Sequence, residues 1–263
     1  MPEPLTHFEV AAGTGRLVLN RPHKRNALSR QLLDELLDAV RRVEVDRSVR
    51  VLVLEAEGPV FCAGMDLAEM QSRAGRPDAA ELWREDTRIY RELIERLFRL
   101  PIPTMAVVQG PLLAGGVGLV LACDIVLAAA EASFSLPEPQ RGITAAVVTP
   151  LLNYRLGPGA ASYALLSGQT VSAADALRMG LCHELLAAGV SPAARRDALL
   201  AAILAGAPSA LALTKSTLQR CAAEDLSRQL DFAMQVSASA RETEDAREGL
   251  AAFLEKRLPS WAP

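Results

Sequence analysis

The sequence predicts an α/β fold in which a helical region follows a core of alternating strands and helices. Strand-like apolar runs occur at residues 16–20, 50–55, 104–109 and 124–128, and helix-like runs separate them. Beyond Pro150 the patterns are almost entirely helical. Strands that alternate with helices are typical of a sheet covered by helices, so we expect the sheet in the first two-thirds of the chain.

The predicted elements have local causes. The first helix is expected to begin after Ser29, whose hydroxyl can accept a hydrogen bond from a free backbone N–H, and its apolar residues keep helical spacing. A long amphipathic helix is predicted from about Asp78 to Leu100, where Pro101 and Pro103 stop it. A short apolar helix is predicted over residues 115–122.

The chain is predicted to divide into a core, residues 1–190, and a C-terminal helical region, residues 191–263. At 263 residues, half of them hydrophobic, the chain can bury a full core without disulfides or metal. The helices predicted beyond Pro150 cover residues 151–156, 160–167, 172–179, 192–205, 209–221, 225–240 and 243–256. The alanine-rich helices after Ser191 can pack as an appendage or form a subunit interface.

Composition excludes several function classes. A net charge of −3 argues against a general nucleic-acid binder, since binding to phosphates needs a concentrated cationic face. No secretory signal is visible, and the uncharged segment 110–123 is too short to span a bilayer. The cysteines have no metal-ligand spacing; they are Cys62, Cys123, Cys182 and Cys221. We therefore expect a cytoplasmic protein with reduced thiols, no metal site, and neither a nucleic-acid nor a membrane partner.

Two glycine-bearing turns are candidates for stabilising negative charge. In the first, residues 61–67 (FCAGMDL), Asp66 is placed to cap the next helix and the Met65 N–H has no intrahelical partner. The second, residues 110–118 (GPLLAGGVG), follows a strand and opens a helix, so the Gly115 N–H lies at the positive helix end. Two such turns facing each other form an oxyanion hole. Taken singly, each turn is equally typical of an ordinary strand–helix connection.

The order and spacing of these motifs resemble the crotonase superfamily, the enoyl-CoA hydratase/isomerase family. The motifs that carry the resemblance lie at residues 19–22 (LNRP), 26–28 (NAL), 61–67, 115–116 (GG), 122–125 (ACDI), 137–138 (PE), 174–180 (ADALRMG), 248–249 (EG) and 252–257 (AFLEKR). The resemblance implies a crotonase-like spiral of ββα turns with a C-terminal helical trimerisation region. It also implies an acyl-CoA thioester as substrate, no separate cofactor, and a homotrimer or dimer of trimers.

The resemblance places three catalytic groups in this chain. The backbone N–H groups of Met65 and Gly115 correspond to the oxyanion-hole donors, each typically worth about 3–4 kcal/mol, and Glu138 corresponds to the acid. Hydratases of the family usually carry a second glutamate three residues beyond the second donor, where this chain has Gly118. In an apolar pocket, Glu138 is expected to have a raised pKa. From the residues alone, a glutamate between two prolines also fits an exposed loop.

The resemblance places the CoA nucleotide against an early basic segment. The expected contacts are Lys24, Arg25, Ala27, Ala63, Asp66 and Lys256. Lys256, together with Arg257, would reach the phosphates from its own or a neighbouring subunit, and both side-chain types suit phosphate. A solvated surface is the alternative for such a basic run. Cys62 adjoins the first turn but has no evident base, so we expect it to pack rather than react.

A single carboxylate leaves several reactions open. Glu138 acting twice, first on a water and then on the alpha carbon, gives hydration; moving one proton gives double-bond isomerisation. Residues 115–119 (GGVGL) are similar to a branch of the family associated with hydration of branched or carboxylated enoyl-CoAs. Hydratase is therefore favoured over isomerase, and over decarboxylase or hydrolase. A member that binds acyl-CoA without turning it over is the alternative of another class.

Overall fold

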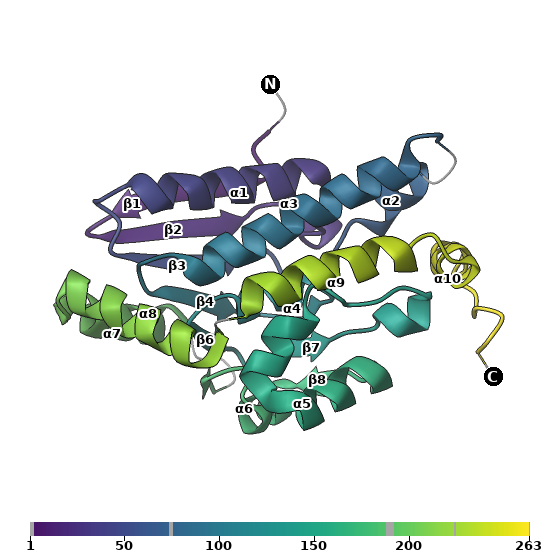
Figure 1. Cartoon of the computed structure of the whole chain (residues 1–263). Coiled ribbons are helices and arrows are strands. Elements are labelled where there is room, and N and C mark those ends of the chain that lie inside the picture. Colours follow the sequence, from purple (N-terminus) through teal and green to yellow (C-terminus); the bar gives the residue numbers. More distant parts are fainter. Residues whose placement is uncertain (1–2, 74–75, 188–191, 224, 263) are drawn as a thin grey trace.

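The computed structural model describes residues 3–73, 76–187, 192–223 and 225–262 (Figure 1). In chain order the elements are β1 (Thr6–Ala11), β2 (Thr14–Leu19), the 3₁₀ turn η1 (Pro22–Lys24), α1 (Arg30–Val45), β3 (Val51–Ala56), α2 (Leu67–Arg73), α3 (Ala79–Arg99), β4 (Thr104–Val108), β5 (Leu112–Leu113), α4 (Gly115–Leu121), β6 (Ile125–Ala128), β7 (Ser133–Ser135), the 3₁₀ turn η2 (Glu138–Arg141), α5 (Thr149–Ser167), β8 (Val171–Ser172), α6 (Ala173–Met179), β9 (Glu184–Leu185), α7 (Pro192–Ala205), α8 (Pro208–Ala223), α9 (Leu226–Ala240) and α10 (Glu244–Glu255).

The strands form two sheets. The larger sheet has the order β1-β2-β3-β4-β6-β9; β1 is antiparallel to β2, and the remaining pairs are parallel. The smaller sheet has the order β5-β7-β8. Parallel neighbours need crossover connections, and α1, α3 and α4 lie in those connections. The predicted α/β class is confirmed.

Helices cover both faces of the larger sheet, because alternate side chains of a strand point to opposite faces. On β3, Leu52 and Leu54 join the large core cluster that includes the buried faces of α1 and α3. Val51 and Val53 point the other way and pack with Leu200 of α7 in a second cluster. A strand apolar on both faces, as β3 is, is typical of a parallel sheet buried on both sides.

The first helices begin and end largely as predicted. Ser29 caps α1, its Oγ accepting a hydrogen bond from the Leu32 N–H at 3.3 Å. The helix α3 ends at Arg99, just before the two prolines. The two helices predicted at 151–156 and 160–167 form the single element α5, which is kinked where Gly157 takes φ +72° ahead of Pro158.

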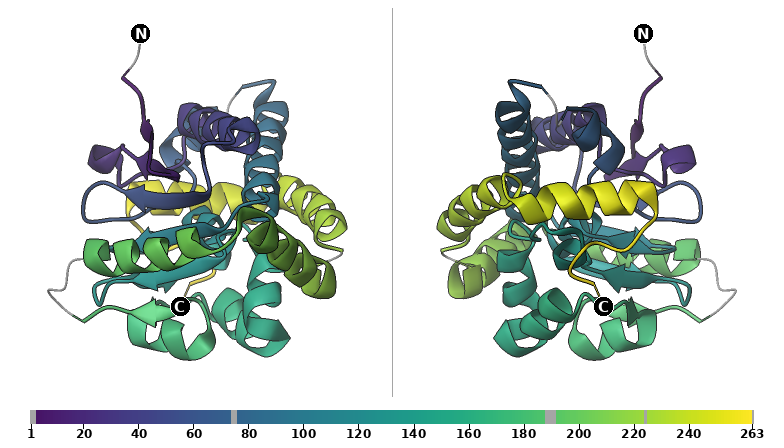
Figure 2. Two further views of the ribbon diagram at one scale, coloured as in Figure 1. Left: turned by 90° about the vertical axis from the view of Figure 1, so that its left-hand side faces the viewer. Right: turned by 90° about the vertical axis from the view of Figure 1, so that its right-hand side faces the viewer.

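The C-terminal helices pack against the rest of the chain. The buried ammonium of Lys215 on α8 lies 2.7 Å from a carboxylate oxygen of Asp124 and also donates to the Ile102 carbonyl at 2.9 Å. The helix α9 runs along α3 (Figure 1), and α10 packs on η2 and α2. In the right-hand view of Figure 2, α10 (yellow) lies across the end of the molecule that faces the viewer. The predicted division at residue 190 lies outside the described residues.

No single helix of the described ranges is both long and apolar enough to cross a bilayer. Among the described helices, only α7 and α8 taken together are long and apolar enough, and they meet at a bend of 103°.

Candidate active site

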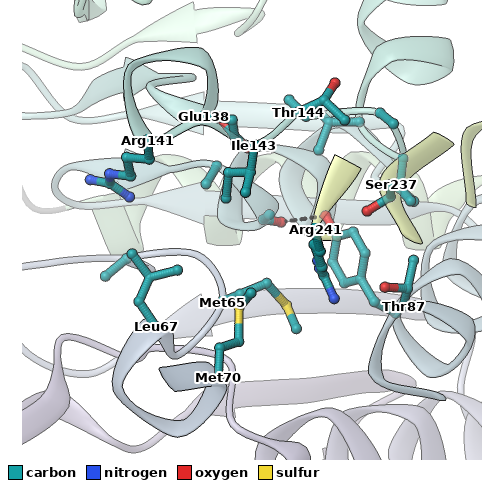
Figure 3. A pocket seen from close by; sticks show the side chains of 18 residues that line it. Met65, Leu67, Met70, Thr87, Glu138, Arg141, Ile143, Thr144, Ser237 and Arg241 are labelled. Carbon is teal, nitrogen blue, oxygen red and sulfur yellow. Dashed lines mark hydrogen bonds between the residues drawn. The ribbon is translucent and has the colours of Figure 1, made fainter. Parts of the chain in front are cut away.

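A narrow pocket lies between the two glycine turns, η2, α3 and α9 (Figure 3). Its volume is about 50 Å³, and it contains the three predicted catalytic positions. The lining residues are Ala63, Met65, Leu67, Met70, Thr87, Tyr90, Ala114, Gly115, Glu138, Arg141, Ile143, Thr144, Ala145, Ala146, Val147, Val148, Ser237 and Arg241. Most of them are apolar, so the few polar groups define the chemistry that the pocket can perform.

The two glycine turns pack directly against each other. Gly64 has φ +80°, and a Cβ at this position would lie 2.6 Å from the Ala114 Cβ, so the close approach requires glycine. Backbone hydrogen bonds join the turns, including Leu113 N–H to Cys62 O at 2.9 Å. Ala114 itself has φ +54°, an unusual conformation for a residue with a side chain, and it turns the backbone into Gly115.

This packing places two free backbone donors on one pocket wall. Among the described residues, neither the Met65 N–H nor the Gly115 N–H donates to a protein acceptor. Both residues line the pocket. Gly115 is also the first residue of α4, where the helix dipole favours a negative charge. Two preorganised donors in a largely apolar pocket can stabilise an oxyanion.

Glu138 is buried in the opposite wall. Its side chain is 6% exposed, and within the described ranges its Oε2 atom has no hydrogen-bond partner. Burial raises the pKa of Glu138 to about 7, against the opposing effects of a backbone hydrogen bond and the positive charge of Arg141. The exposed-loop alternative is therefore wrong, and the direction of the pKa shift agrees with the expectation.

A tyrosine occupies the space beside Gly118, where the second acid of hydratases is expected. A Cβ at Gly118 would lie 2.1 Å from the Tyr90 hydroxyl oxygen, so no larger residue fits unless Tyr90 moves. The buried Tyr90 hydroxyl donates to the Gly115 carbonyl oxygen at 2.6 Å (dashed line in Figure 3). Burial raises the pKa of Tyr90, and the charge of Glu138 adds to this effect, so the phenol stays protonated.

Residues 9–263 match the family model described as enoyl-CoA hydratase/isomerase. The chain belongs to this family.

Relatives and solved structures extend the match over nearly the full chain. A Thermus thermophilus protein named "Putative enoyl-CoA hydratase" is 38% identical over 241 residues, which cover 92% of this chain and 94% of the relative. An enoyl-CoA isomerase/hydratase of Mycosarcoma maydis is 34% identical over 267 residues, covering 98% and 95%. The crystal structure of an enoyl-CoA hydratase from Mycobacterium avium matches with a TM-score of 0.87 and 32% identity over 99% of this chain and 100% of that one. The predicted crotonase-like fold is thus confirmed.

The basic turn predicted to contact CoA adjoins the pocket of this family member. Lys24 and Arg25 are exposed at the end of η1, and the Arg25 carbonyl accepts a hydrogen bond from the N–H of Ala63 at 3.0 Å. The buried Asn26 holds the turn by donating to the Glu57 and Val60 carbonyls, both at 2.9 Å. Ala27 follows, half-buried. The turn therefore presents two exposed cations beside a residue that lines the pocket.

The other two predicted CoA contacts have different surroundings. Asp66 caps α2 as predicted, accepting from the Glu69 N–H at 3.1 Å, and it also pairs with Arg21 at 2.7 Å. Lys256 is exposed at the end of α10 and is not part of the pocket lining. Its neighbour Arg257 pairs with Glu248 at 2.6 Å. Contact of Asp66 and Lys256 with CoA stays a prediction.

Cys62 has the surroundings of a packing residue. Its thiol is fully buried and donates to the Asn26 carbonyl at 3.2 Å. Burial raises the pKa of Cys62 to about 12, which disfavours the thiolate that a nucleophile would need. Within the described ranges, no group of three or more His, Cys, Asp or Glu side chains is arranged to hold a metal ion.

Sequence reasoning missed six polar residues of the pocket: Arg141 and Thr144 in and after η2, Tyr90 and Thr87 on α3, and Ser237 and Arg241 at the end of α9. Tyr90 and Thr87 fall within an amphipathic helix, where the pattern indicates burial but no partner. Ser237 and Arg241 lie in a helix far from the glycine turns in the chain. No sequence motif marks them, because only the packing of α9 along α3 brings them into the pocket.

Proposed function

We propose that this protein is an enoyl-CoA hydratase that adds water across the double bond of a 2-enoyl-CoA, with Glu138 as its single acid–base group. The observation that carries the proposal is the pairing of a buried carboxylate with two free backbone donors around one pocket. The donors suit a thioester oxygen, and the carboxylate suits proton transfer at the adjacent carbons.

In the proposed reaction the thioester oxygen accepts hydrogen bonds from the N–H groups of Met65 and Gly115. The ionised Glu138 takes a proton from a water, whose oxygen forms a bond to C3. The π electrons of the double bond move to give the enolate, and its oxygen is stabilised by the two donors. Protonated Glu138 then delivers the proton to C2. The enolate collapses to the 3-hydroxyacyl thioester, and the carboxylate is restored.

The surroundings of Glu138 support both of its roles. A general base works best when its pKa lies near the operating pH, because it must accept a proton in one step and return it in the next. The pKa of Glu138, raised to about 7 by burial, meets this condition. A free Oε2 atom leaves the carboxylate available for a water or a substrate carbon.

Double-bond isomerisation is the second candidate, and Tyr90 favours it. The hydroxyl of Tyr90 occupies the space beside Gly118 that a second acid would need. Isomerisation requires one carboxylate to remove a proton from C2 and return it to C4, with no held water. Hydration by one carboxylate remains the first proposal, since a single group can activate water and then protonate carbon.

CoA binding and assembly complete the proposal. We propose that Lys24, Arg25, Ala27, Ala63 and Asp66 contact the CoA moiety, and that Lys256 reaches its phosphates from the same or a neighbouring subunit. We further propose a homotrimer or dimer of trimers. Large apolar side chains are exposed on three helices, at Tyr163, Leu166, Leu213, Leu218 and Phe232. The mass in solution, measured by light scattering, should be three or six times 28.1 kDa.

The proposed function is tested by mass spectrometry in deuterated water. Wild type and Glu138→Gln are incubated with a panel of short, branched and carboxylated enoyl-CoAs. A gain of the mass of one water in the wild type, lost in the variant, supports hydration. Deuterium uptake with a shifted double bond and no added water makes the protein an isomerase. If bound acyl-CoA neither exchanges nor reacts, the protein is a binding member of the family.

A further inference from the structure

One end of the pocket is polar. Thr87 of α3 meets Ser237 and Arg241 of α9, which are four residues apart and therefore lie on the same helix face. The Thr87 hydroxyl and an Nη atom of Arg241 both donate to the Trp83 carbonyl, at 2.8 and 3.1 Å, so these two side chains converge. Figure 3 shows Arg241 and Ser237 on the side of the pocket away from Arg141.

Arg241 has no counter-ion of its own. In the described part of the chain it forms no ion pair, and its hydrogen bond to Trp83 uses one of the five donors of a guanidinium. The acid whose charge acts on it, Asp86, is already paired with Arg30 at 2.6 Å and with Arg73 at 2.7 Å. Burial lowers the pKa of Arg241 to about 10, so the side chain is still cationic near neutrality.

The interaction with the helix dipole does not by itself account for the position of Arg241. Arg241 is the C-cap of α9, where the helix dipole favours a cation, but an exposed arginine would serve that purpose equally well. Here the guanidinium instead lines a largely apolar pocket, and an unpaired buried charge is costly. An anion that enters the pocket would complete its hydrogen bonds.

The direction of the pocket indicates which part of a substrate reaches Arg241. The oxyanion donors hold the thioester at Met65 and Gly115. The CoA moiety extends toward the basic turn. This turn adjoins the Arg141 side of the pocket, since the charge of Arg25 contributes to lowering the pKa of Arg141. The acyl chain therefore points toward the opposite side, which carries Thr87, Ser237 and Arg241. A void of about 50 Å³ restricts that chain to a short one unless Met65 and Met70, which are flexible, move aside.

We infer that Arg241, with Ser237 and Thr87, binds a carboxylate at the far end of the acyl chain. The substrate is then the CoA monothioester of a short unsaturated dicarboxylic acid. Arginine suits this task because its planar donor fork matches a carboxylate. The inference rests on the proposed function for the orientation of the thioester, and it adds the chemical class of the acyl group.

A size-matched pair of substrates tests the inference. Both have five-carbon acyl chains: 4-carboxy-2-butenoyl-CoA ends in a carboxylate and 2-pentenoyl-CoA in a methyl group. In the wild type, kcat/KM should be about 10- to 100-fold higher for the carboxylated substrate, the usual gain from a charge-assisted pair. In Arg241→Met this ratio should collapse to about 1 or below. The control Arg178→Met removes an exposed arginine of α6 and should keep the wild-type ratio.

Binding of unreactive analogues separates this inference from the proposed reaction. Calorimetry compares the saturated thioesters 4-carboxybutanoyl-CoA and pentanoyl-CoA, which cannot be hydrated. Tighter binding of the carboxylated analogue by the wild type, lost in Arg241→Met, supports the carboxylate site even if neither enoyl-CoA is turned over. Equal binding of both analogues, or an equal loss of both in Arg241→Met, overturns it. Arg241→Lys, which keeps the charge, shows whether the methionine variant fails only by misfolding, because lysine should retain part of the preference.

Discussion

The η2 wall of the pocket carries Glu138 and the α9 wall carries Arg241, and burial moves the pKa values of these two side chains in opposite directions. The pKa of Glu138 on η2 rises to about 7, whereas that of Arg241 on α9 falls to about 10. In both cases burial disfavours the charged form. Near neutrality Glu138 exchanges its proton readily, while Arg241 keeps its charge.

The two side chains differ in charge near neutral pH because the ordinary pKa values of a carboxyl and a guanidinium lie at different distances from pH 7. Burial moves the pKa of the Glu138 carboxyl from 4.5 into the neutral range. The ordinary pKa of a guanidinium is so high that Arg241 stays cationic even after burial lowers it. The same desolvation therefore suits the η2 wall to proton transfer and the α9 wall to recognition of a fixed negative charge. A pocket can thus obtain two functions from one physical effect.

The largest expected effect follows the loss of proton transfer at the η2 wall. Glu138→Gln keeps the size of the side chain but cannot carry a proton, so kcat/KM should fall about 10³-fold. Loss of the enoyl-thioester absorbance measures the rate. Glu131→Gln, which changes an exposed glutamate, is the control and should keep full activity. A loss below about tenfold in Glu138→Gln would assign the proton transfer to another group.

The difference in stability between the wild type and Glu138→Gln should depend on pH. The folded pKa of Glu138 lies above its ordinary value of 4.5, so protonation stabilises the fold. This contribution is fully present below about pH 4.5 and is lost as pH rises through about 7. From pH 4.5 to 8 the wild type should lose about 3 kcal/mol of unfolding free energy relative to Glu138→Gln, at about 1.4 kcal/mol per pKa unit. Urea unfolding at both pH values measures the difference.

At the α9 wall, the effect of Arg241→Met on stability should not depend on pH. Because Arg241 is protonated in both folded and unfolded states below pH 9, the stability difference between wild type and Arg241→Met should stay constant between pH 4.5 and 8. The same urea series measures it. A slope as steep as that of Glu138→Gln would mean that the two walls do not differ in the way proposed.

A smaller effect is expected where Tyr90 fills the space beside Gly118. Gly118→Ala adds a Cβ 2.1 Å from the Tyr90 hydroxyl and should lower the unfolding free energy by about 1–3 kcal/mol. Combining it with Tyr90→Phe removes the contacted oxygen and should restore part of the loss. A double-mutant cycle by urea unfolding tests this coupling. Simple additivity would show that the tyrosine does not occupy the site of the second acid.

The smallest effect concerns the oxyanion turn. Tyr90→Phe removes the hydrogen bond to the Gly115 carbonyl, which helps to position the peptide of the second donor. We expect kcat to fall about 3- to 10-fold, the usual range for one neutral hydrogen bond, with KM nearly unchanged. Steady-state kinetics measure both values. A rise in KM at constant kcat would assign the hydroxyl to substrate binding instead.

The sequence alone was sufficient where the signal was local or periodic. Ser29 and the spacing of apolar residues predicted α1, and the same spacing followed by prolines predicted α3. The strands β5, β8 and β9 contain two residues each, which is too short for any period to show. The edge strand β1 is largely exposed, so it lacks the apolar run that marks β3.

In the candidate site, too, the sequence was sufficient only where the signal was local. The free N–H groups of Met65 and Gly115 could be predicted from the local pattern of the two glycine turns, whereas Glu138 was identified through the resemblance to the family. The burial of Glu138 could not be predicted, because the prolines beside it fit an exposed loop equally well. Tyr90 and Arg241 entered the pocket only through the packing of α3, α4 and α9.

The sequence by itself determined the α/β class, the two glycine turns and the one available carboxylate. Tertiary structure decided that Tyr90 closes the space at Gly118 and that Arg241 lies in the pocket wall without a counter-ion among the described residues. The physical reason is that a turn is specified by the conformational preferences of a few adjacent residues. An apolar helix face specifies only that it is buried, and which surface buries it depends on the whole fold.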